Sequence, residues 1–371
     1  MRWILVFILA CLVAVPQALA RKTNGPIYED PFDLGAGGAS LTRASKEGVL
    51  YSNPALLPLG ASFFRWTGLT STLLVNKESV AAAQKIAKDA QGSQNSGSSD
   101  AATQSSELID KVFKNPIHLG WGLALSTVTS AFGLSVFSRF EPDISAHQFG
   151  STGLPEIELR TEGYHGVVLG TAVRTPMRWL LFGVTAKYLY AGEQDLAVQL
   201  TDSEAIAGFG QQSFVQDLVA LNKGVGVDVG TLLFFQGDHF DLNIAAKADD
   251  LGNTKLTGLS AQPKEFKQVT SAGVALTLHS TLDALHFAAD YRDLGGAYKE
   301  DLFKRLHVGT KVMLRTFLGI SGGYYDGYPS MGVEFDPRIF RIAVTAYTRE
   351  LGDHPGVDPR HIYVASFSAG F

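Results

Sequence analysis

One serine in the sequence sits in a pattern that some hydrolases use for a nucleophile. Gly319-Ile320-Ser321-Gly322-Gly323 fits Gly-x-Ser-x-Gly, in which a sharp turn from strand to helix exposes the serine hydroxyl. Here the motif lies within an alternating, strand-like segment instead of a strand-turn-helix elbow. We therefore do not expect Ser321 to be a nucleophile, and the sequence predicts no enzyme.

A glycine-rich stretch near the N-terminus has the composition of a phosphate-binding loop. It runs Gly35-Ala36-Gly37-Gly38-Ala39-Ser40, and backbone N–H groups in such a loop can cradle a phosphate. A nucleotide loop also needs a preceding strand and a Gly-Lys-Ser or Gly-Lys-Thr ending, and this stretch has neither. Nucleotide binding is therefore not expected.

The residue types that bind metals are dispersed along the chain. The nine histidines form no His-Glu-x-x-His pair, and the single cysteine is Cys11, so we predict no metal and no other cofactor. The charged residues at alternate positions of predicted strands are expected to pair across a wet interior and not to catalyse: Asp228, Asp241, Lys247, Asp290, Arg292, Lys311, Glu334 and Arg341.

The elements that would position these side chains are strands with one apolar and one more polar face. In residues 340–348, for example, Phe340, Ile342 and Val344 alternate with Arg341 and Thr345. Such patterns predict strands near 61–75, 116–126, 130–140, 157–173, 178–190, 224–235, 239–249, 268–278, 284–292, 304–314, 316–325, 328–336, 339–349 and 361–371. Fourteen is an even number, as a closed barrel of the bacterial outer-membrane type requires.

The predicted connections alternate in length along the chain. Those after the even-numbered strands are short, such as 127–129 and 174–177. The others are mostly long, including 76–115, 141–156, 191–223 and 250–267, with 326–327 as the tight exception. Short periplasmic turns opposite longer outer loops are typical of outer-membrane barrels, so we predict an all-β, transmembrane antiparallel barrel. A soluble secreted sandwich is the other class that alternation permits.

The composition of the 371 residues agrees with many short strands. The chain is 46% hydrophobic, 18% charged and contains 39 glycines, which excludes a disordered chain and a coiled coil. The formal net charge of −5 implies no general attraction to nucleic acid. Beyond the first residues there is no apolar run of 18, so no helical membrane span is predicted.

The first twenty residues have the features of a cleaved signal peptide. Arg2 gives a minimal positive region, residues 3–15 are apolar, and Ala18-Leu19-Ala20 supplies small residues for cleavage before Arg21. An N-terminal membrane anchor and a lipoprotein site at Cys11 are the alternatives. Cleavage would leave a mature chain with no cysteine, exported to the cell outer membrane of a Gram-negative type of cell.

Residues 21–60 are not strand-like and contain the most specific motif. Gly35 to Ser40 is followed by a short apolar stretch and by Asn53-Pro54-Ala55 just before the first predicted strand. This arrangement resembles the N-terminal hatch of the FadL family, outer-membrane transporters of long-chain fatty acids and other hydrophobic molecules. Related barrels of the PorV type and TraF-like envelope proteins share the pattern. A plain turn at Asn53 and Pro54 is the simpler reading.

The resemblance implies a barrel over 61–371 whose lumen holds a plug, 21–60, that gates passage of a hydrophobic small molecule. Gly35, Gly37, Gly38, Asn53, Pro54 and Ala55 would be the hatch residues, with glycine and alanine letting its backbone pass close to the wall. Gly163 and Gly166 interrupt a long strand and are candidates for a kink or bulge, or else only bend the strand for closure. The alternative function is a non-transporting barrel that scaffolds an envelope secretion or conjugation complex.

Three further features bear on partners. Helical spacing within 76–115 and 191–223 predicts helical insertions in the outer loops, which either cap the barrel mouth or offer an oily entry or docking site. The last predicted strand ends on Phe371, which resembles the C-terminal signal that the outer-membrane insertion machinery reads. The apolar faces of the strands would contact outer-membrane lipid.

Overall fold

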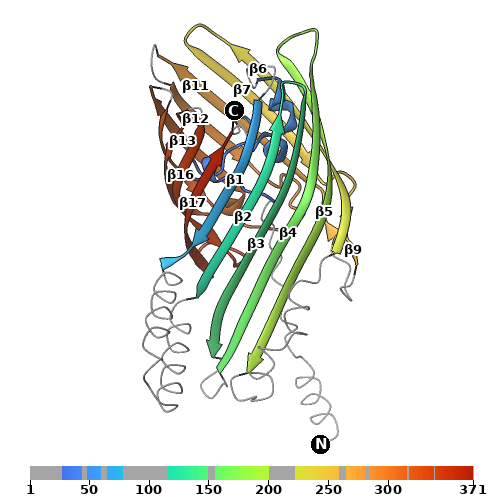
Figure 1. The fold of residues 1–371 in the computed structure, drawn as a ribbon, viewed down its shortest axis with the longest axis vertical. Helices are drawn as coiled ribbons and strands as arrows, with labels where there is room; N and C mark the ends of the chain where they lie inside the picture. The colour runs from blue at the N-terminus through green and yellow to red at the C-terminus, as the bar shows by residue number, and fades with distance from the viewer. Residues whose placement is uncertain are drawn as a thin grey trace, which may run out of the picture.

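Fourteen long strands form one closed antiparallel barrel (Figure 1). The computed structural model describes residues 27–43, 48–59, 65–77, 116–148, 155–199, 222–258, 265–280, 284–315, 317–337 and 339–370. The predicted signal peptide, 1–20, and Phe371 lie outside these residues. The predicted number of strands and the predicted all-β antiparallel barrel are confirmed.

The first seven long strands are β1 (Arg65–Val75), β2 (Ile117–Val128), β3 (Phe132–Gln148), β4 (Pro155–Arg174), β5 (Leu180–Gln199), β6 (Asn222–Gln236) and β7 (Phe240–Asp249). The other seven are β11 (Val269–His279), β12 (Ala284–Tyr291), β13 (Leu306–Leu314), β14 (Leu318–Tyr325), β15 (Tyr328–Phe335), β16 (Phe340–Glu350) and β17 (Pro359–Ala369). Short pieces lie between them: β8 (Thr254–Lys255), β9 (Thr257–Gly258), β10 (Glu265–Phe266) and the helix α8 (Leu302–Arg305).

Each long strand pairs with the long strands before and after it in the sequence, and the first pairs with the last. The closing register places Thr70 of β1 opposite Ser368 of β17, and their hydroxyls lie 3.0 Å apart. In the tight connection between β14 and β15, Asp326 and Gly327 have φ angles of 50° and 91°. Both positive values fit the two-residue hairpin turn whose twist matches that of paired strands.

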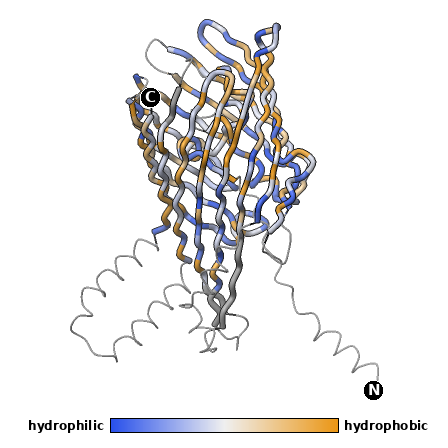
Figure 2. Tube along the Cα trace, turned by 45° about the vertical axis from the view of Figure 1, so that its right-hand side comes forward, coloured by the Kyte–Doolittle hydropathy of each residue, from blue (hydrophilic) through white to orange (hydrophobic). Residues whose placement is uncertain are grey.

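The apolar faces of the strands point outward and the polar faces point into the barrel. On β16, Val344 is 57% exposed, whereas the next residue, Thr345, is 3% exposed. On β17, Tyr363 and Phe367 are exposed while Ser366 and Ser368 are buried. Hydrophobic and hydrophilic residues alternate along the strands (Figure 2). The barrel thus has an apolar outside and a lumen that buries charged side chains.

Two predicted connections are shorter than expected. β3 continues to Gln148 and β5 continues to Gln199, past the predicted starts of the loops 141–156 and 191–223. β4 and β6 begin at Pro155 and Asn222, before the predicted ends of these loops. The register between β4 and β5 is unbroken out to Glu156 opposite Gln199. β3, β4 and β5 consequently extend past their neighbours (Figure 1).

The predicted helical insertions fall mostly outside the described residues, at 78–115 and 200–221. Within the part of the chain that the structure describes, no helix is long and apolar enough to cross a membrane.

Pairing is continuous through Gly163 and Gly166 of β4 on both sides of the strand. These two glycines therefore introduce no shift of register, and a bend there remains a prediction.

The hydrogen-bonded ladder between β2 and β3 is interrupted. His118 pairs with Asp143 and Trp121 pairs with Phe140, but the ladder lapses between them, opposite Pro142, which has no N–H group to donate.

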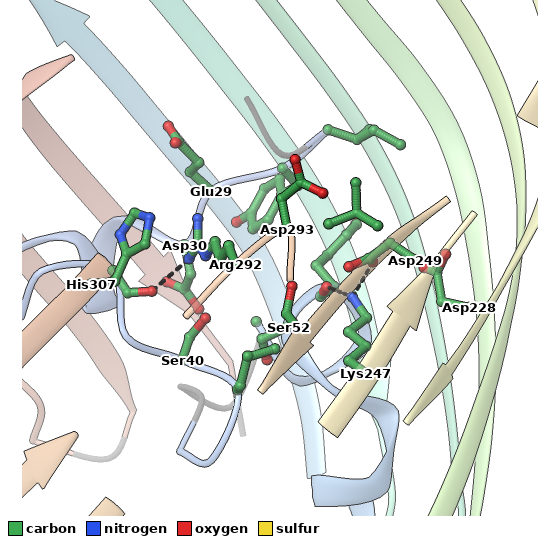
Figure 3. Close-up of a pocket in the computed structure, with 18 of the residues that line it drawn as sticks. Glu29, Asp30, Ser40, Ser52, Asp228, Lys247, Asp249, Arg292, Asp293 and His307 are labelled. Atoms are coloured by element: carbon green, nitrogen blue, oxygen red, sulfur yellow. Dashed lines mark hydrogen bonds and ion pairs between the residues drawn. The ribbon is translucent and has the colours of Figure 1, made fainter. Parts of the chain in front are cut away.

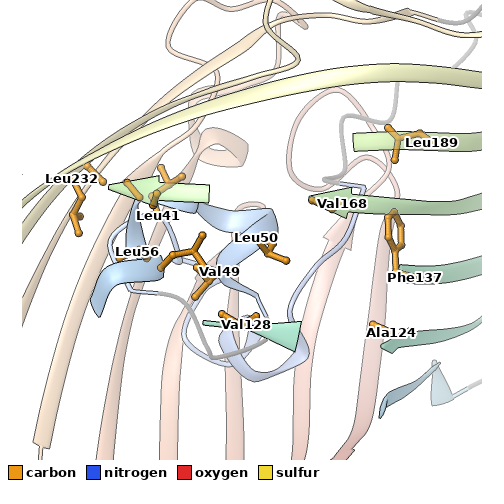
Figure 4. Close-up of a cluster of buried hydrophobic side chains, with 14 of the residues drawn as sticks. Leu41, Val49, Leu50, Leu56, Ala124, Val128, Phe137, Val168, Leu189 and Leu232 are labelled. Atoms are coloured by element: carbon orange, nitrogen blue, oxygen red, sulfur yellow. The ribbon is translucent and has the colours of Figure 1, made fainter. Parts of the chain in front are cut away.

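The chain before β1 lies against the inner face of the barrel. We call Ile27–Arg43 together with Gly48–Leu59 the N-terminal segment; it contains the helical turns α2 (Pro31–Leu34), α3 (Val49–Ser52) and η1 (Pro54–Leu59). The Asp30 carboxylate caps α2 by accepting a hydrogen bond from the Phe32 N–H, 3.0 Å away. Leu50 and Leu56 of the segment join a buried cluster with Val128, Phe137, Val168 and Leu232 of the wall (Figure 4).

Candidate functional site

Asn53, Pro54 and Ala55 lie directly on the wall at a pair of facing glycines. The fully buried Asn53 amide donates to the Leu41 carbonyl, 2.9 Å away, and its Oδ1 accepts from the Ala55 N–H at 3.0 Å. Gly183 of β5 and Gly230 of β6 are opposite each other in the register, and a Cβ on either would overlap the tripeptide. Because glycine has no side chain, these two positions leave space on the wall that the segment fills.

A second pair of facing glycines receives the glycine-rich stretch. Gly309 of β13 is opposite Gly323 of β14, and a Cβ on either would overlap the backbone of Ala36 or Gly37. The φ of Gly37 is 70°, a conformation that favours glycine. Gly35 lies against Gly332 of β15, where an added Cβ would be 2.8 Å from the Gly332 Cα. These contacts require small residues on both surfaces.

Polar groups of the wall complete the backbone hydrogen bonds of this stretch. The Asp290 carboxylate accepts from the N–H groups of Ser40 and Leu41, at 2.6 and 2.9 Å. Arg292 donates to the Gly38 carbonyl at 2.7 Å, and His307 Nδ1 lies 2.9 Å from the Gly37 carbonyl. Asp290 and Arg292 were expected to pair with other charges; instead they hold the N-terminal segment.

Glu29, at the start of the segment, is clamped by a cluster of buried charges. Its carboxylate contacts Arg349 of β16 and, at 3.3 Å, Arg139 of β3, and it accepts a hydrogen bond from the Tyr325 hydroxyl. Both arginines also contact Glu141, at 2.6 and 2.5 Å. Burial would raise the pKa of Glu29, but Arg349, Arg139 and the Tyr325 hydroxyl together hold it below its ordinary value. We call Glu29 with Arg139 and Arg349 the Glu29 clamp. It fixes the segment to β3 and β16, which are far apart in the sequence.

A second cluster of charges lies on β5, β6 and β7. The Lys187 ammonium is 2.7 Å from Asp228 and 2.9 Å from Asp250. Lys247 contacts Asp249 at 2.5 Å and donates to the Tyr51 carbonyl of the N-terminal segment at 2.5 Å. Burial raises the pKa of Asp250 despite the adjacent Lys187.

Between these clusters lies a cavity of about 210 Å³, lined by the N-terminal segment, the wall and the connections at the long-loop end (Figure 3). Its aromatic lining includes Tyr28 and Tyr51, whose rings stack with centroids 4.2 Å apart, and Tyr164 beside Phe266. Its charged lining includes the Glu29 clamp and the cluster around Lys187. The arrangement can hold a compact molecule with an apolar body.

Comparison with known proteins gives a likeness in structure only. No model of a protein family matches the sequence, and no curated protein matches it. The solved structure of a "TodX deltaS2S3 mutant monoaromatic hydrocarbon channel" matches 92% of this chain and 98% of its own length, with a TM-score of 0.53 and 12% identity. The chain has the fold of that channel, in agreement with the resemblance to the FadL family that the sequence suggested.

Two toluene transporters match less closely over similar lengths. TbuX of Ralstonia pickettii has a TM-score of 0.48 and 12% identity, over 94% of this chain and 100% of its own. TodX of Pseudomonas putida has a TM-score of 0.47 and 13% identity, over 91% of this chain and 97% of its own. The likeness to the monoaromatic hydrocarbon channel, at 12% identity, concerns the fold alone.

The other residues singled out from the sequence have clear positions in this fold. Ser321 lies in the middle of β14, where its hydroxyl donates to the Gly332 carbonyl at 3.2 Å. Glu334 of β15 pairs with Lys311 of β13 and with Arg341 of β16, the latter at 2.9 Å, so these charges pair along the inner face of the wall and not across the interior. Among the described residues there is no group of three or more side chains placed to hold a metal ion.

The sequence interpretation missed the Glu29 clamp. Arg139 and Glu141 are two residues apart on β3 and so share a face, and Arg349 is inward on β16. Buried arginines at inward positions, next to an inward glutamate on β3, were a usable signal. Glu29 itself had none, because the N-terminal segment follows no period.

Proposed function

We propose that this protein is an outer-membrane channel for hydrophobic small molecules and that its N-terminal segment is the hatch. The observation that carries the proposal is the seating of the segment: two pairs of facing glycines and the Glu29 clamp hold it in a closed barrel beside a cavity with aromatic lining. A barrel of fourteen strands is too wide for its own side chains to fill, so a packed segment would close it.

The outer surface supports the membrane setting. Outward-facing aromatic residues gather near the short turns, where Trp179 lies beside Phe235 with centroids 6.3 Å apart. A second group, including Tyr188 and Tyr190, lies further along β5. At 3.3 Å per residue and a tilt of about 45°, Trp179 and Tyr190 are about 25 Å apart along the barrel axis, close to the height of an outer-membrane apolar band.

The cargo would enter the cavity from the long-loop side and leave once the hatch shifts. The resemblance implies fatty acids as one class of cargo, and the channel of similar fold is named for monoaromatic hydrocarbons. The interrupted ladder at Pro142, between β2 and β3, offers a weaker seam for exit through the wall than the continuous ladders around Gly163 and Gly166. Transport, and not catalysis, is the activity that we expect.

Uptake by cells tests this proposal. Cells making the protein should take up a radiolabelled hydrophobic substrate faster than cells without it, and deletion of residues 53–55 should change that rate. Heat-modifiable migration on a gel checks that the deleted barrel is folded, and leakage of a large hydrophilic dye checks for an unplugged pore. Unchanged substrate uptake and unchanged leakage in the folded deletion would count against a gating hatch.

A scaffold in an envelope complex is the second candidate. The extension of β3, β4 and β5 beyond their neighbours favours it, since such a projection offers a contact surface outside the membrane (Figure 1). Uptake equal in cells with and without the protein would favour this role over transport.

A further inference from the structure

The charge of the cavity lining narrows the class of cargo. Eleven carboxylate side chains line the cavity, against seven from lysine and arginine. The lining around a bound molecule is therefore acidic in balance. A ligand carboxylate in this space would lose its hydration and meet a negative potential.

Each of the seven cationic side chains already has a partner. Lys187 and Lys247 contact aspartates, and Arg139 and Arg349 contact glutamates. The other three donate to backbone carbonyls: Arg292 to Gly38, Lys267 to Ala297 and Lys304 to Gly352. A carboxylate ligand would have to share one of these cations with its present partner, whereas a hydroxyl or an ammonium would not need one.

The apolar lining suits a ring. The lining residues Tyr28 and Tyr51 stack on each other, and Phe137, which is outside the lining, packs edge-on against both rings with centroids 6.2 and 5.4 Å away. Tyrosine faces attract cations as well as apolar rings. Aromatic faces next to an excess of carboxylates form a favourable site for a neutral or positively charged amphiphile.

We propose that the cavity takes up apolar, ring-bearing molecules whose polar end is neutral or cationic, and that it discriminates against carboxylates. This inference rests on the proposed transport function and specifies its cargo. Ionised fatty acids would then be poor ligands of this cavity.

Three probes with one skeleton test the inference: 4-phenylbutan-1-ol, 4-phenylbutylamine and 4-phenylbutanoate. Their binding to the full chain in a neutral detergent is measured at pH 7.4 by isothermal titration calorimetry. The alcohol and the amine should bind, and the carboxylate should bind at least about tenfold more weakly. Equal affinity of the carboxylate and the alcohol would overturn the inference and leave the proposed function standing. Binding of none of the three would overturn the proposed function and the inference with it.

Variants of two lining carboxylates locate the effect. Asp249→Asn releases Lys247 from its ion pair, and Glu162→Gln removes a charge that lies 2.9 Å from Arg160. Each should strengthen binding of the carboxylate several-fold relative to binding of the alcohol. The matched control is Asp353→Asn, an exposed position at the same end of the barrel and outside the lining, which should change neither. Carboxylate affinity unaffected in both folded lining variants would contradict the assignment to this cavity.

Discussion

Replacing Glu29 by glutamine should loosen the first part of the N-terminal segment, residues 27–43. Glutamine keeps the shape of the side chain but removes the charge that faces Arg349 and Arg139. Removal of one partner from a buried ion pair costs about 3–5 kcal/mol when the other is left uncompensated. Here Glu141 still contacts both arginines, so the loss is confined to the charge-assisted hydrogen bonds of Glu29 itself.

A hydrogen bond to a charged group contributes about 1.5–3 kcal/mol, so we expect the docked state to lose about 2–3 kcal/mol. At about 1.4 kcal/mol per factor of ten, the undocked population should rise about 30- to 150-fold. Hydrogen–deuterium exchange of peptides within 27–43, measured by mass spectrometry in lipid nanodiscs, reports this population directly.

The control variant is Asp241→Asn, which removes an inward carboxylate that contacts His279 at 2.7 Å and lies outside the cavity lining. It should leave exchange in 27–43 unchanged. Peptides from β2 serve as a reference for the wall and should exchange equally in all proteins. Exchange in 27–43 within about twofold of the unmodified protein, with β2 unaffected, would refute the argument that Glu29 holds the segment.

Two further predictions use the same exchange measurement. Gly183→Val should speed exchange in residues 48–59, because the valine side chain would overlap the backbone of Pro54 and Ala55 and overpacking costs about 1–3 kcal/mol. The control Gly122→Val should leave that exchange unchanged, because the nearest atom to a Cβ added at Gly122 is 3.6 Å away. Acid should loosen 27–43: the pKa of Glu29 is lowered, so the docking free energy that it supplies is complete above its ordinary value of 4.5 and is lost as the pH falls through the lowered pKa. The Glu29→Gln variant should lack this acid response, and an equal response in both proteins would assign it to other groups.

The strands were predictable because each carries its own signal. β16 and β17 alternate between outward apolar and inward polar residues along nearly their whole length, and the structure keeps those faces. The extensions of β3 and β5 were missed because residues that usually end or weaken a strand pattern stand at their start, Pro142 on β3 and Gly192 on β5. Their pairing depends on backbone groups, which leave no mark on side-chain type.

The seating of the N-terminal segment was only partly predictable. Its small residues and the Asn53-Pro54-Ala55 motif indicated close packing. The wall glycines that the segment packs against, such as Gly183 and Gly230, are recognisable only once the strand register is known. The Glu29 clamp joins residues more than a hundred positions apart on different strands. Such contacts depend on how the strands are arranged around the barrel, which one sequence does not reveal.

The central claim is that the N-terminal segment must move for cargo to pass. Leu50 Cγ lies 3.1 Å from the Cβ position of Gly133 on β3, close enough for Leu50→Cys with Gly133→Cys to form a disulfide. The only native cysteine, Cys11, is within the predicted signal peptide. In proteoliposomes the oxidised double variant should pass a hydrophobic substrate at the rate of empty vesicles, and reduction should restore the rate of the single variants. Equal flux before and after reduction, with the disulfide confirmed by mass spectrometry, would contradict the account.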